Sequence, residues 1–256
     1  MKNLLYFFVF SIFLISSCAT VPYSKRQSLI LISIEEEIAL GEETFKELMK
    51  KAKLSEDKEK VEMIERVGRK IAKVADQPKY KWEFVLIEDT KTINAFCLPG
   101  GKVAFYTGIL PLCKDEEGVA VVMGHEIAHA IARHGAERMS QGMIANLAGN
   151  ILAVAVANKT PEAQRAILDA YGLGTSLGVI LPFSRKHEYE ADYIGLILMS
   201  KAGYNPNSAV DFWKRMLELS GGKSIPEFLS THPNDKKRIE NIKSHLPEAM
   251  KYYENR

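Results

Sequence analysis

The sequence is short of the features that mark several classes of protein. Its 34 Lys and Arg residues almost balance its 32 Asp and Glu residues, which leaves a net charge of +2. Nucleic-acid-binding domains usually show a clear basic excess, so this balance argues against a nucleic-acid partner. No internal repeat or low-complexity block is visible. At 256 residues the chain is long enough for a full hydrophobic core, and we expect one domain with at most an appendage.

Long apolar runs are also missing, and the two that come nearest are too short to cross a bilayer comfortably. The first, residues 4–15, follows the positive Lys2 and is typical of the apolar part of a signal peptide. The second, residues 143–157, is interrupted by Asn146 and Asn150. We expect this second run to form a buried helix, with shallow membrane contact as the alternative.

Cysteine is scarce, and each of the three cysteines gives information about the cellular compartment in which the protein resides. Ile15-Ser16-Ser17-Cys18 resembles a bacterial lipobox, in which the cysteine is acylated and becomes the mature N-terminus. We therefore predict a lipoprotein signal peptide at 1–17, a tether at 18–30 that starts from lipidated Cys18, and a folded domain at 31–256. An ordinary signal peptide with an incidental cysteine is the alternative. Cys97 and Cys113 could form a disulfide or remain free, since sequence does not give their separation.

Chemistry-bearing residues first appear in the apolar stretch Val121-Val122-Met123-Gly124-His125-Glu126-Ile127-Ala128-His129-Ala130. Residues four apart share one face of a helix, so His125 and His129 can offer imidazole nitrogens to one metal ion. Glu126 lies about 100° round the helix from His125, close enough to reach a water bound to that metal. Zinc lowers the pKa of such a water to about 7, and a neighbouring carboxylate can take its proton. The stretch predicts a zinc peptidase site on a helix that runs from Glu116 to about Gln141.

A second acidic motif opens another predicted helix, and it reads Glu188-Tyr189-Glu190-Ala191-Asp192. Glu188 and Asp192 are four residues apart and share a face. A catalytic zinc site of two histidines and a glutamate leaves one position open, so Glu188 is the predicted third ligand. Asp192 could hold a ligand histidine by its other ring nitrogen. The plain alternative is a solvated acidic helix face.

The remaining pattern predicts an α+β fold that is predominantly helical, with a small sheet beside the metal helix. Residues 82–87 and 102–107 have the composition of strands. An exposed sheet edge can take an extended substrate as an added strand through backbone hydrogen bonds. The candidate substrate-binding residues lie in and between the two strands, and they are Asn94, Ala95, Phe96, Val103, Ala104 and Phe105. Sequence alone does not show which edge is free, and both strands could serve the core only.

Together these motifs resemble a family of zinc peptidases that includes the CAAX prenyl proteases, HtpX, BepA and the mitochondrial protease with overlapping activity. The matching pieces occur in the family's order over roughly residues 33–245. They are Asn94-Ala95-Phe96, Pro99-Gly100-Gly101, Thr107-Gly108, His125-Glu126-Ile127-Ala128-His129, Glu188-Tyr189-Glu190-Ala191-Asp192, and Thr231-His232-Pro233 with Arg238.

This resemblance implies a zincin fold of the gluzincin type that holds one zinc ion, with Glu126 as the catalytic base. The implied ligands are His125, His129 and Glu188. It also implies that His232 faces the metal, where it would steady an oxyanion or occupy the open coordination position of a latent enzyme. Arg238 is expected to orient the site or to bind the substrate backbone.

The predicted function is a zinc-dependent endopeptidase that hydrolyses unfolded or misassembled proteins of the bacterial cell envelope. Because clear membrane spans are missing, the chain departs from the prenyl-protease and HtpX branches and favours the periplasmic one, with its lipid anchor in the outer membrane. One alternative is a lipid-anchored chaperone or assembly factor with a normally latent peptidase site. Another is a purely structural zinc site with His232 as a fourth ligand. The physiological substrate and the oligomeric state do not follow from the sequence.

Overall fold

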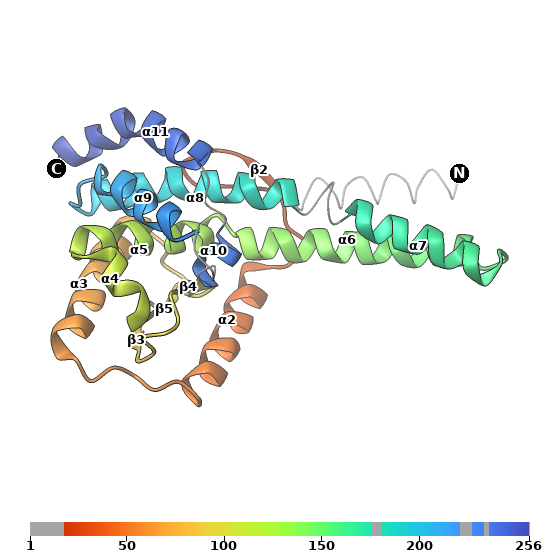
Figure 1. Ribbon diagram of the computed structural model, residues 1–256, viewed down its shortest axis with the longest axis horizontal. Coiled ribbons are helices and arrows are strands. Elements are labelled where there is room, and N and C mark those ends of the chain that lie inside the picture. The colour runs from red at the N-terminus through yellow and green to blue at the C-terminus, as the bar shows by residue number, and fades with distance from the viewer. Residues whose placement is uncertain (1–17, 176–180, 221–226, 233–235, 256) are drawn as a thin grey trace. The chain divides into compact units, whose positions relative to one another are not determined.

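The computed structural model of the protein describes residues 18–175, 181–220, 227–232 and 236–255, and it divides the chain into two compact units (Figure 1). The core unit comprises Ile34–Ala132 and His187–Arg256. The hairpin unit comprises the described part of Met1–Ser33 together with Arg133–Lys186. Residues 133–186 fall within the predicted domain at 31–256 and group here with the N-terminal segment, and the domain boundaries stay a prediction. The predicted signal peptide at 1–17 lies outside the described residues.

A three-stranded sheet forms the β layer of the core unit, in the order β3-β5-β4. Strand β3 (Glu83–Ile87) is parallel to β5 (Lys102–Tyr106), and β4 (Ala95–Leu98) is antiparallel to it. The predicted strands are confirmed, but Val103, Ala104 and Phe105 are fully buried on the central strand. Their backbone groups already pair with strands on both sides, so no extended peptide can be added beside them, and their assignment as substrate-binding residues stays a prediction.

The two outer edges of this sheet differ. The Ser55 N–H donates to the Leu86 carbonyl at 2.9 Å, and the Glu88 N–H donates to the Lys53 carbonyl at 2.7 Å, so the β3 edge is covered. Among the described residues, no backbone hydrogen bond reaches the outer side of β4 (Ala95–Leu98). An extended peptide could therefore be added only beside β4.

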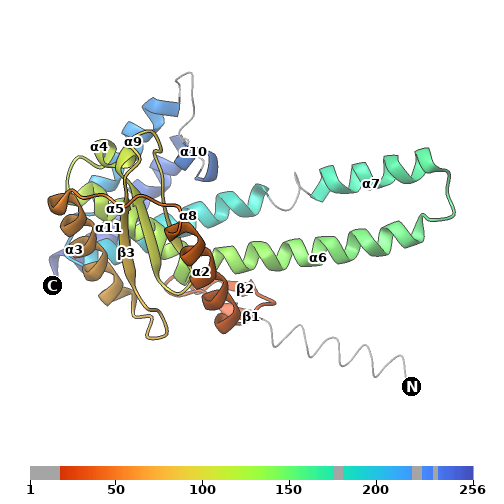
Figure 2. The same ribbon diagram turned by 90° about the horizontal axis from the view of Figure 1, so that it is seen from below.

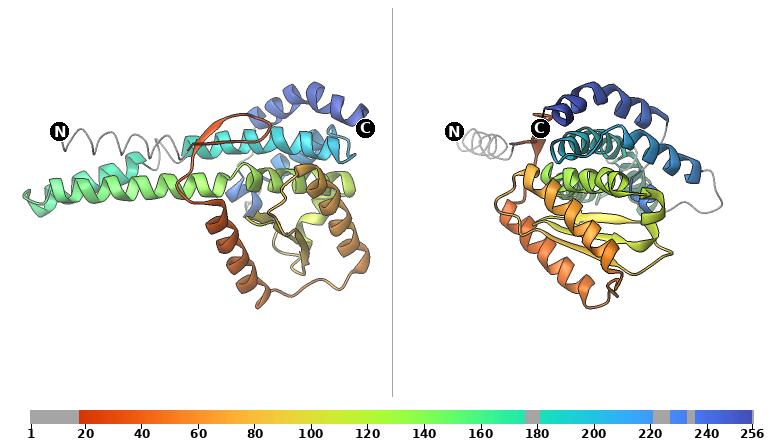
Figure 3. Two further views of the ribbon diagram at one scale, coloured as in Figure 1. Left: turned by 180° about the vertical axis from the view of Figure 1, so that it is seen from behind. Right: turned by 90° about the vertical axis from the view of Figure 1, so that its left-hand side faces the viewer.

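Helices pack around this sheet in the core unit (Figure 3). Helix α3 (Lys58–Ala75) has an Asp57 N-cap and buries one apolar stripe, and it lies against β3 and α5 (Glu116–Ile131). Asp115 caps α5, whose residues are almost all buried. The other elements are α2 (Ile34–Met49), the 3-10 turn η1 (Thr107–Ile109), α4 (Leu110–Cys113), α8 (Leu181–Lys201, which belongs to this unit from His187 on), α9 (Ser208–Ser220), α10 (Glu227–Thr231) and α11 (Lys236–Glu254).

The hairpin unit contains the antiparallel strands β1 (Cys18–Thr20) and β2 (Gln27–Leu29) and the helices α6 (His134–Ala155) and α7 (Pro161–Thr175). The predicted tether at 18–30 is thus largely a β-hairpin. Arg26 pairs with Glu137 through two hydrogen bonds of 3.0 and 2.8 Å, and the Leu31 N–H donates to Ser140 Oγ at 2.8 Å. These contacts fix the strands to α6.

Two predictions about the middle of the chain are wrong. The metal helix was expected to continue to Gln141, but α5 ends at Ile131 and Arg133 adopts a left-handed backbone with φ of 57°. Residues 143–157 were expected to be buried, but the large side chains of α6 are exposed. Figure 2 shows α6 and α7 side by side as a helical hairpin. Within the described residues, no helix is long and apolar enough to cross a bilayer.

The two described cysteines outside β1 are free thiols, so the disulfide left open by the sequence is not formed. Burial raises the pKa of Cys113 to about 12, despite the opposing charge of Arg215. Cys113 is therefore an inert, protonated thiol of the core.

Candidate metal centre

The two motif histidines lie one helical turn apart on α5. Their Nε2 atoms are 3.1 Å apart, and His125 is almost completely buried. Two nitrogens bound to one tetrahedral zinc at the usual bond length lie about 3.4 Å apart. The separation on α5 is close to this value, so the pair can share one ion.

A glycine pair brings the third predicted ligand to the same point. Helices α5 and α8 touch at Gly124 and Gly195, where a Cβ built on Gly195 would lie 3.0 Å from the backbone of Gly124. Only residues without side chains allow this approach. Glu188 lies two turns before Gly195 on α8, and its carboxylate oxygens are 3.4 Å from His125 Nε2 and 3.3 Å from His129 Nε2.

His232 is a fourth donor at this point. Its Nδ1 lies 3.2 Å from His125 Nε2 and 3.1 Å from the nearer oxygen of Glu188. One atom from each of the four residues can be chosen so that all lie within 4.8 Å of one another, and the set is His125, His129, Glu188 and His232. Nitrogen and carboxylate donors at this spacing are the set that zinc binds in proteins, so the residues present fit a zinc ion.

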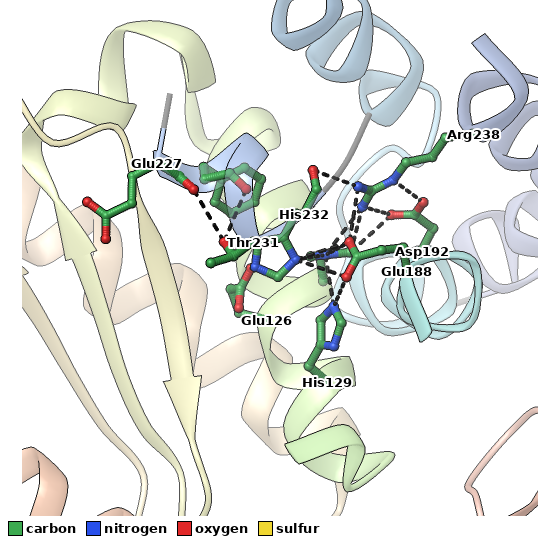
Figure 4. A network of polar contacts seen from close by, with 10 residues as sticks. Glu126, His129, Glu188, Asp192, Glu227, Thr231, His232 and Arg238 are labelled. Atoms are coloured by element: carbon green, nitrogen blue, oxygen red, sulfur yellow. Dashed lines mark hydrogen bonds and ion pairs between the residues drawn. The ribbon is translucent and has the colours of Figure 1, made fainter. Parts of the chain in front are cut away.

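The predicted supporting residues form a buried ionic network behind the donors (Figure 4). Asp192 Oδ1 lies 3.0 Å from His125 Nδ1, and Arg238 holds the same carboxylate through hydrogen bonds of 2.7 and 2.9 Å. Arg238 also lies 3.1 Å from Glu188. Asp192 therefore fixes the ring of His125, the usual arrangement around a metal-binding histidine.

The opposite charges of this network keep one another ionised although they are buried. Burial would raise the pKa of Asp192 and Glu188, but Arg238 lowers the first and His129 and Arg238 lower the second well below its ordinary value. Burial would lower the pKa of His125, and the hydrogen bonds to Asp192 and Glu188 outweigh it and raise that pKa. Both carboxylates therefore remain ionised, as a cation site requires.

Glu126 has a different environment from the other carboxylates. Its side chain is buried, and desolvation raises its pKa to about 7, although His232 acts in the opposite direction. Its Oε1 has no hydrogen-bond partner among the described residues and lies 3.5 Å from His232 Nε2. A buried carboxylate with a free oxygen and a pKa near neutrality can exchange protons with a small molecule at the centre.

The segment that carries His232 is anchored to the start of β4. The Phe228 N–H donates to the Ile93 carbonyl at 3.0 Å, and the Asn94 side-chain amide donates to Glu227 at 3.1 Å. The predicted substrate-binding residues around it are only partly accessible, since Ala95 and Asn94 are buried and Phe96 is half-buried. Asn94 thus uses its side chain to hold α10. Pro233, which completes the predicted motif, lies outside the described residues.

Sequence reasoning missed the aromatic residues of the site. The ring of Trp213 on α9 lies 3.5 Å from the guanidinium carbon of Arg238 and 5.6 Å from the ring of His125. Phe228 packs on His232 with ring centroids 4.6 Å apart. Buried aromatics at helical spacing carry no signal that separates them from ordinary core residues, so only the fold identifies them.

Comparison with known proteins gives a consistent picture. The family model described as Peptidase family M48 matches residues 58–246. The mitochondrial metalloendopeptidase OMA1 of Schizosaccharomyces pombe is 41% identical over 235 residues, which is 90% of this chain and 67% of that protein. OMA1 of Saccharomyces cerevisiae is 34% identical over 95% of this chain and 73% of its own length. The beta-barrel assembly-enhancing protease of Escherichia coli is 30% identical over 87% of this chain and 46% of its own length.

These relatives correct one prediction about the chain. The location in the bacterial cell envelope is wrong, because the relatives that share the higher identities are mitochondrial proteins. The signal peptide at 1–17 and the acylation of Cys18 are tested by none of these observations and stay predictions.

Proposed function

Because the chain belongs to peptidase family M48 and is a zinc metalloendopeptidase, we propose that it hydrolyses unfolded or misassembled polypeptides at the centre built from α5 and α8. The convergence of four metal-binding side chains on one point carries this proposal. His125, His129 and Glu188 would hold the ion, which supplies charge to polarise a carbonyl and to acidify a water.

Glu126 acts as the proton carrier in the proposed reaction. Its free Oε1 accepts a proton from water as the water oxygen attacks the carbonyl carbon of the peptide bond. The same proton then passes to the amide nitrogen as the carbon–nitrogen bond breaks, which releases an amine and a carboxylate. A pKa raised to about 7 suits both steps at neutral pH, and a divalent cation on the neighbouring ligands would lower it.

The outer edge of β4 is the proposed substrate-binding site. Backbone pairing there needs an extended peptide and no particular side chains, so a folded protein could not enter. This selection by conformation supports unfolded polypeptides as the substrate class. The E. coli relative is named as an assembly-enhancing protease, which is compatible with such a role.

An alternative is a chaperone or assembly factor whose peptidase site is usually silent. Its support is the place of His232, whose Nδ1 lies among the donor atoms of the other three residues. A histidine in that place would compete with water and substrate. His232→Ala separates two cases: lower kcat with unchanged KM if the residue stabilises the charged intermediate, by about 10²–10³ in rate, and higher basal cleavage if it blocks the site.

Cleavage of unfolded casein by the Glu126→Gln protein tests the main proposal. We expect full zinc content and loss of turnover, because an amide cannot carry the proton. Glu116→Gln is the matched control, since it makes the same change at the first turn of the same helix. Turnover by Glu126→Gln equal to that of the control would refute the role of Glu126. Wild-type zinc content in a Glu188→Ala protein would refute the ligand set.

A further inference from the structure

Helix α6 presents a face of large aliphatic side chains to water. We call it the aliphatic face, and it consists of Met139, Met143, Ile144, Leu147, Ile151 and Val154. The exposed fractions range from 43% to 78%. Most members are three or four residues apart, so they lie along one side of the helix. Such a continuous exposed apolar surface usually marks a site of interaction.

The neighbouring helix of the hairpin lies against a different side of α6. The Tyr171 hydroxyl donates to the Ala145 carbonyl at 2.8 Å, and a Cβ built on Gly149 would lie 3.3 Å from the Tyr171 ring. Ala145 and Gly149 are turned away from the aliphatic face on the helical wheel. Contact with α7 therefore leaves the aliphatic face open.

The charge pattern of α6 is unlike that of a helix that only faces water. No ionisable side chain occurs among the twenty residues from Met139 to Asn158, although 26% of the residues in the chain are charged. Helix α3 shows the ordinary pattern, with a buried apolar stripe and an exposed side that carries charges such as Glu65 and Arg69. Helix α6 therefore lacks the charged outer side that an exposed helix such as α3 carries.

We propose that the aliphatic face lies in the surface of a phospholipid membrane. The uncharged stretch is bounded by exposed cations, Arg138 at one end and Lys159 and Arg165 at the other. Long basic side chains can reach anionic headgroups while the aliphatic side chains enter the acyl layer. Glu162 and Asp169 are the only anions of this hairpin from Arg138 to its end, so three cations face two anions.

A membrane fits this face better than a protein partner does. Interfaces between proteins are anchored by Tyr, Trp and Arg, and they use hydrogen bonds to fix the register. The aliphatic face has no aromatic residue, no Arg and no hydrogen-bonding side chain, and only its two methionines belong to a type that is enriched at protein interfaces. Since no described helix, α6 included, is long and apolar enough to cross a bilayer, we place α6 along the surface and not through it.

The test places an environment-sensitive fluorophore on the aliphatic face of the full chain, as Leu147→Cys in a Cys18→Ser and Cys97→Ala background, which leaves only the buried Cys113 beside the new thiol. Vesicles of phosphatidylcholine with roughly 30% phosphatidylglycerol supply the membrane. We expect the emission to rise about twofold or more on addition of vesicles and to be quenched by nitroxide-labelled lipids. Leu40→Cys is the matched control, because Leu40 is another exposed leucine on a helix, with 44% exposed. Its probe should not respond.

This readout reports the position of one residue, so membrane attachment through the N-terminal segment does not imitate it. An unchanged probe at position 147 overturns the proposal, whether or not the protein sediments with the vesicles. A probe already shielded before vesicles are added also overturns it, because the chain itself or a second copy would then cover the face. As a second variant, Leu147→Glu with Ile151→Glu should abolish lipid quenching of a probe placed at Met143→Cys, whereas Leu40→Glu should not.

Discussion

The core unit and the hairpin unit place their side chains in opposite ways. The core unit buries ionisable groups, among them His125, Glu188, Asp192 and Arg238. The hairpin unit exposes aliphatic groups along α6. Burying a charge without a partner costs free energy, and so does exposing a large apolar surface to water, so both placements need an explanation.

The two regions differ in what offsets this unfavourable environment. Each of these four buried groups has a partner of opposite charge within 3.4 Å, so this network is complete within the chain except for a metal. The described residues supply no cover for the aliphatic face of α6. The first region is organised by internal electrostatics, and the second presents an apolar face that the described residues leave uncovered.

The largest expected effect comes from breaking the charge network. Arg238→Met keeps an unbranched side chain but removes the guanidinium, which leaves Asp192 and Glu188 buried without their shared cation. We expect a loss of about 3–5 kcal/mol in the free energy of unfolding, measured by urea denaturation. Arg69→Met is the control, since Arg69 is an exposed arginine in a weak helical pair, and it should change stability by less than about 0.5 kcal/mol. Equal effects of the two substitutions would contradict the network.

The next effect concerns Glu126, the acid of the site whose ionised form the network does not stabilise. Burial raises the pKa of Glu126 from 4.5 to about 7, so the folded protein without metal keeps a proton that the unfolded chain has lost. Between these values the wild type loses stability as pH rises, by about 1.4 kcal/mol per unit. Glu126→Gln lacks this loss.

The measurement is urea denaturation of both proteins with a chelator present. The advantage of Glu126→Gln should grow between pH 4.5 and about 7 to about 3 kcal/mol and remain level above that range. Acidic groups with lowered pKa values act equally in both proteins and cancel in the difference. An advantage that does not depend on pH would show that Glu126 is not protonated in the folded state.

The parts of the fold that sequence predicts are those encoded locally. His125 and His129 lie on one helical turn, and Glu188 was found because the helix that follows places it on the same face as Asp192. In contrast, the central place of Val103 in the sheet depends on which strands pair, and that is a property of distant segments. The apolar run at 143–157 shows that one helix face is apolar, but it does not show whether another segment of the chain packs against that face.

The same reasoning explains the missed break between α5 and α6. Helices usually end at Gly or Pro, and Arg133 with its positive φ gives no such signal. Trp213 was missed because its contact with Arg238 joins two helices that are separate in sequence.

A third prediction uses a close contact of the core unit. Gly195→Ala places a methyl group 3.0 Å from Gly124 and from the His125 backbone nitrogen, so α5 and α8 must separate. We expect a loss of about 1–3 kcal/mol in unfolding free energy and weaker zinc binding, because Glu188 moves away from the two histidines. Chelator competition measures the zinc affinity. Unchanged affinity would mean that the helix crossing does not position the ligand.

The smallest expected effect comes from a Gly→Ala substitution in the hairpin unit. It should change the free energy of unfolding in the opposite direction to Gly195→Ala. Gly142 lies inside α6, and a Cβ built there meets nothing within 4 Å. Glycine weakens a helix interior because the unfolded chain gains more freedom from it than from alanine. Gly142→Ala should therefore raise the free energy of unfolding by about 0.5–1 kcal/mol, with no change in zinc affinity. Because the added methyl group is identical in both proteins, opposite signs would show that contact decides the outcome in the core unit and helix propensity decides it in α6. A loss of stability from Gly142→Ala would instead mean that this part of α6 is packed against another part of the protein.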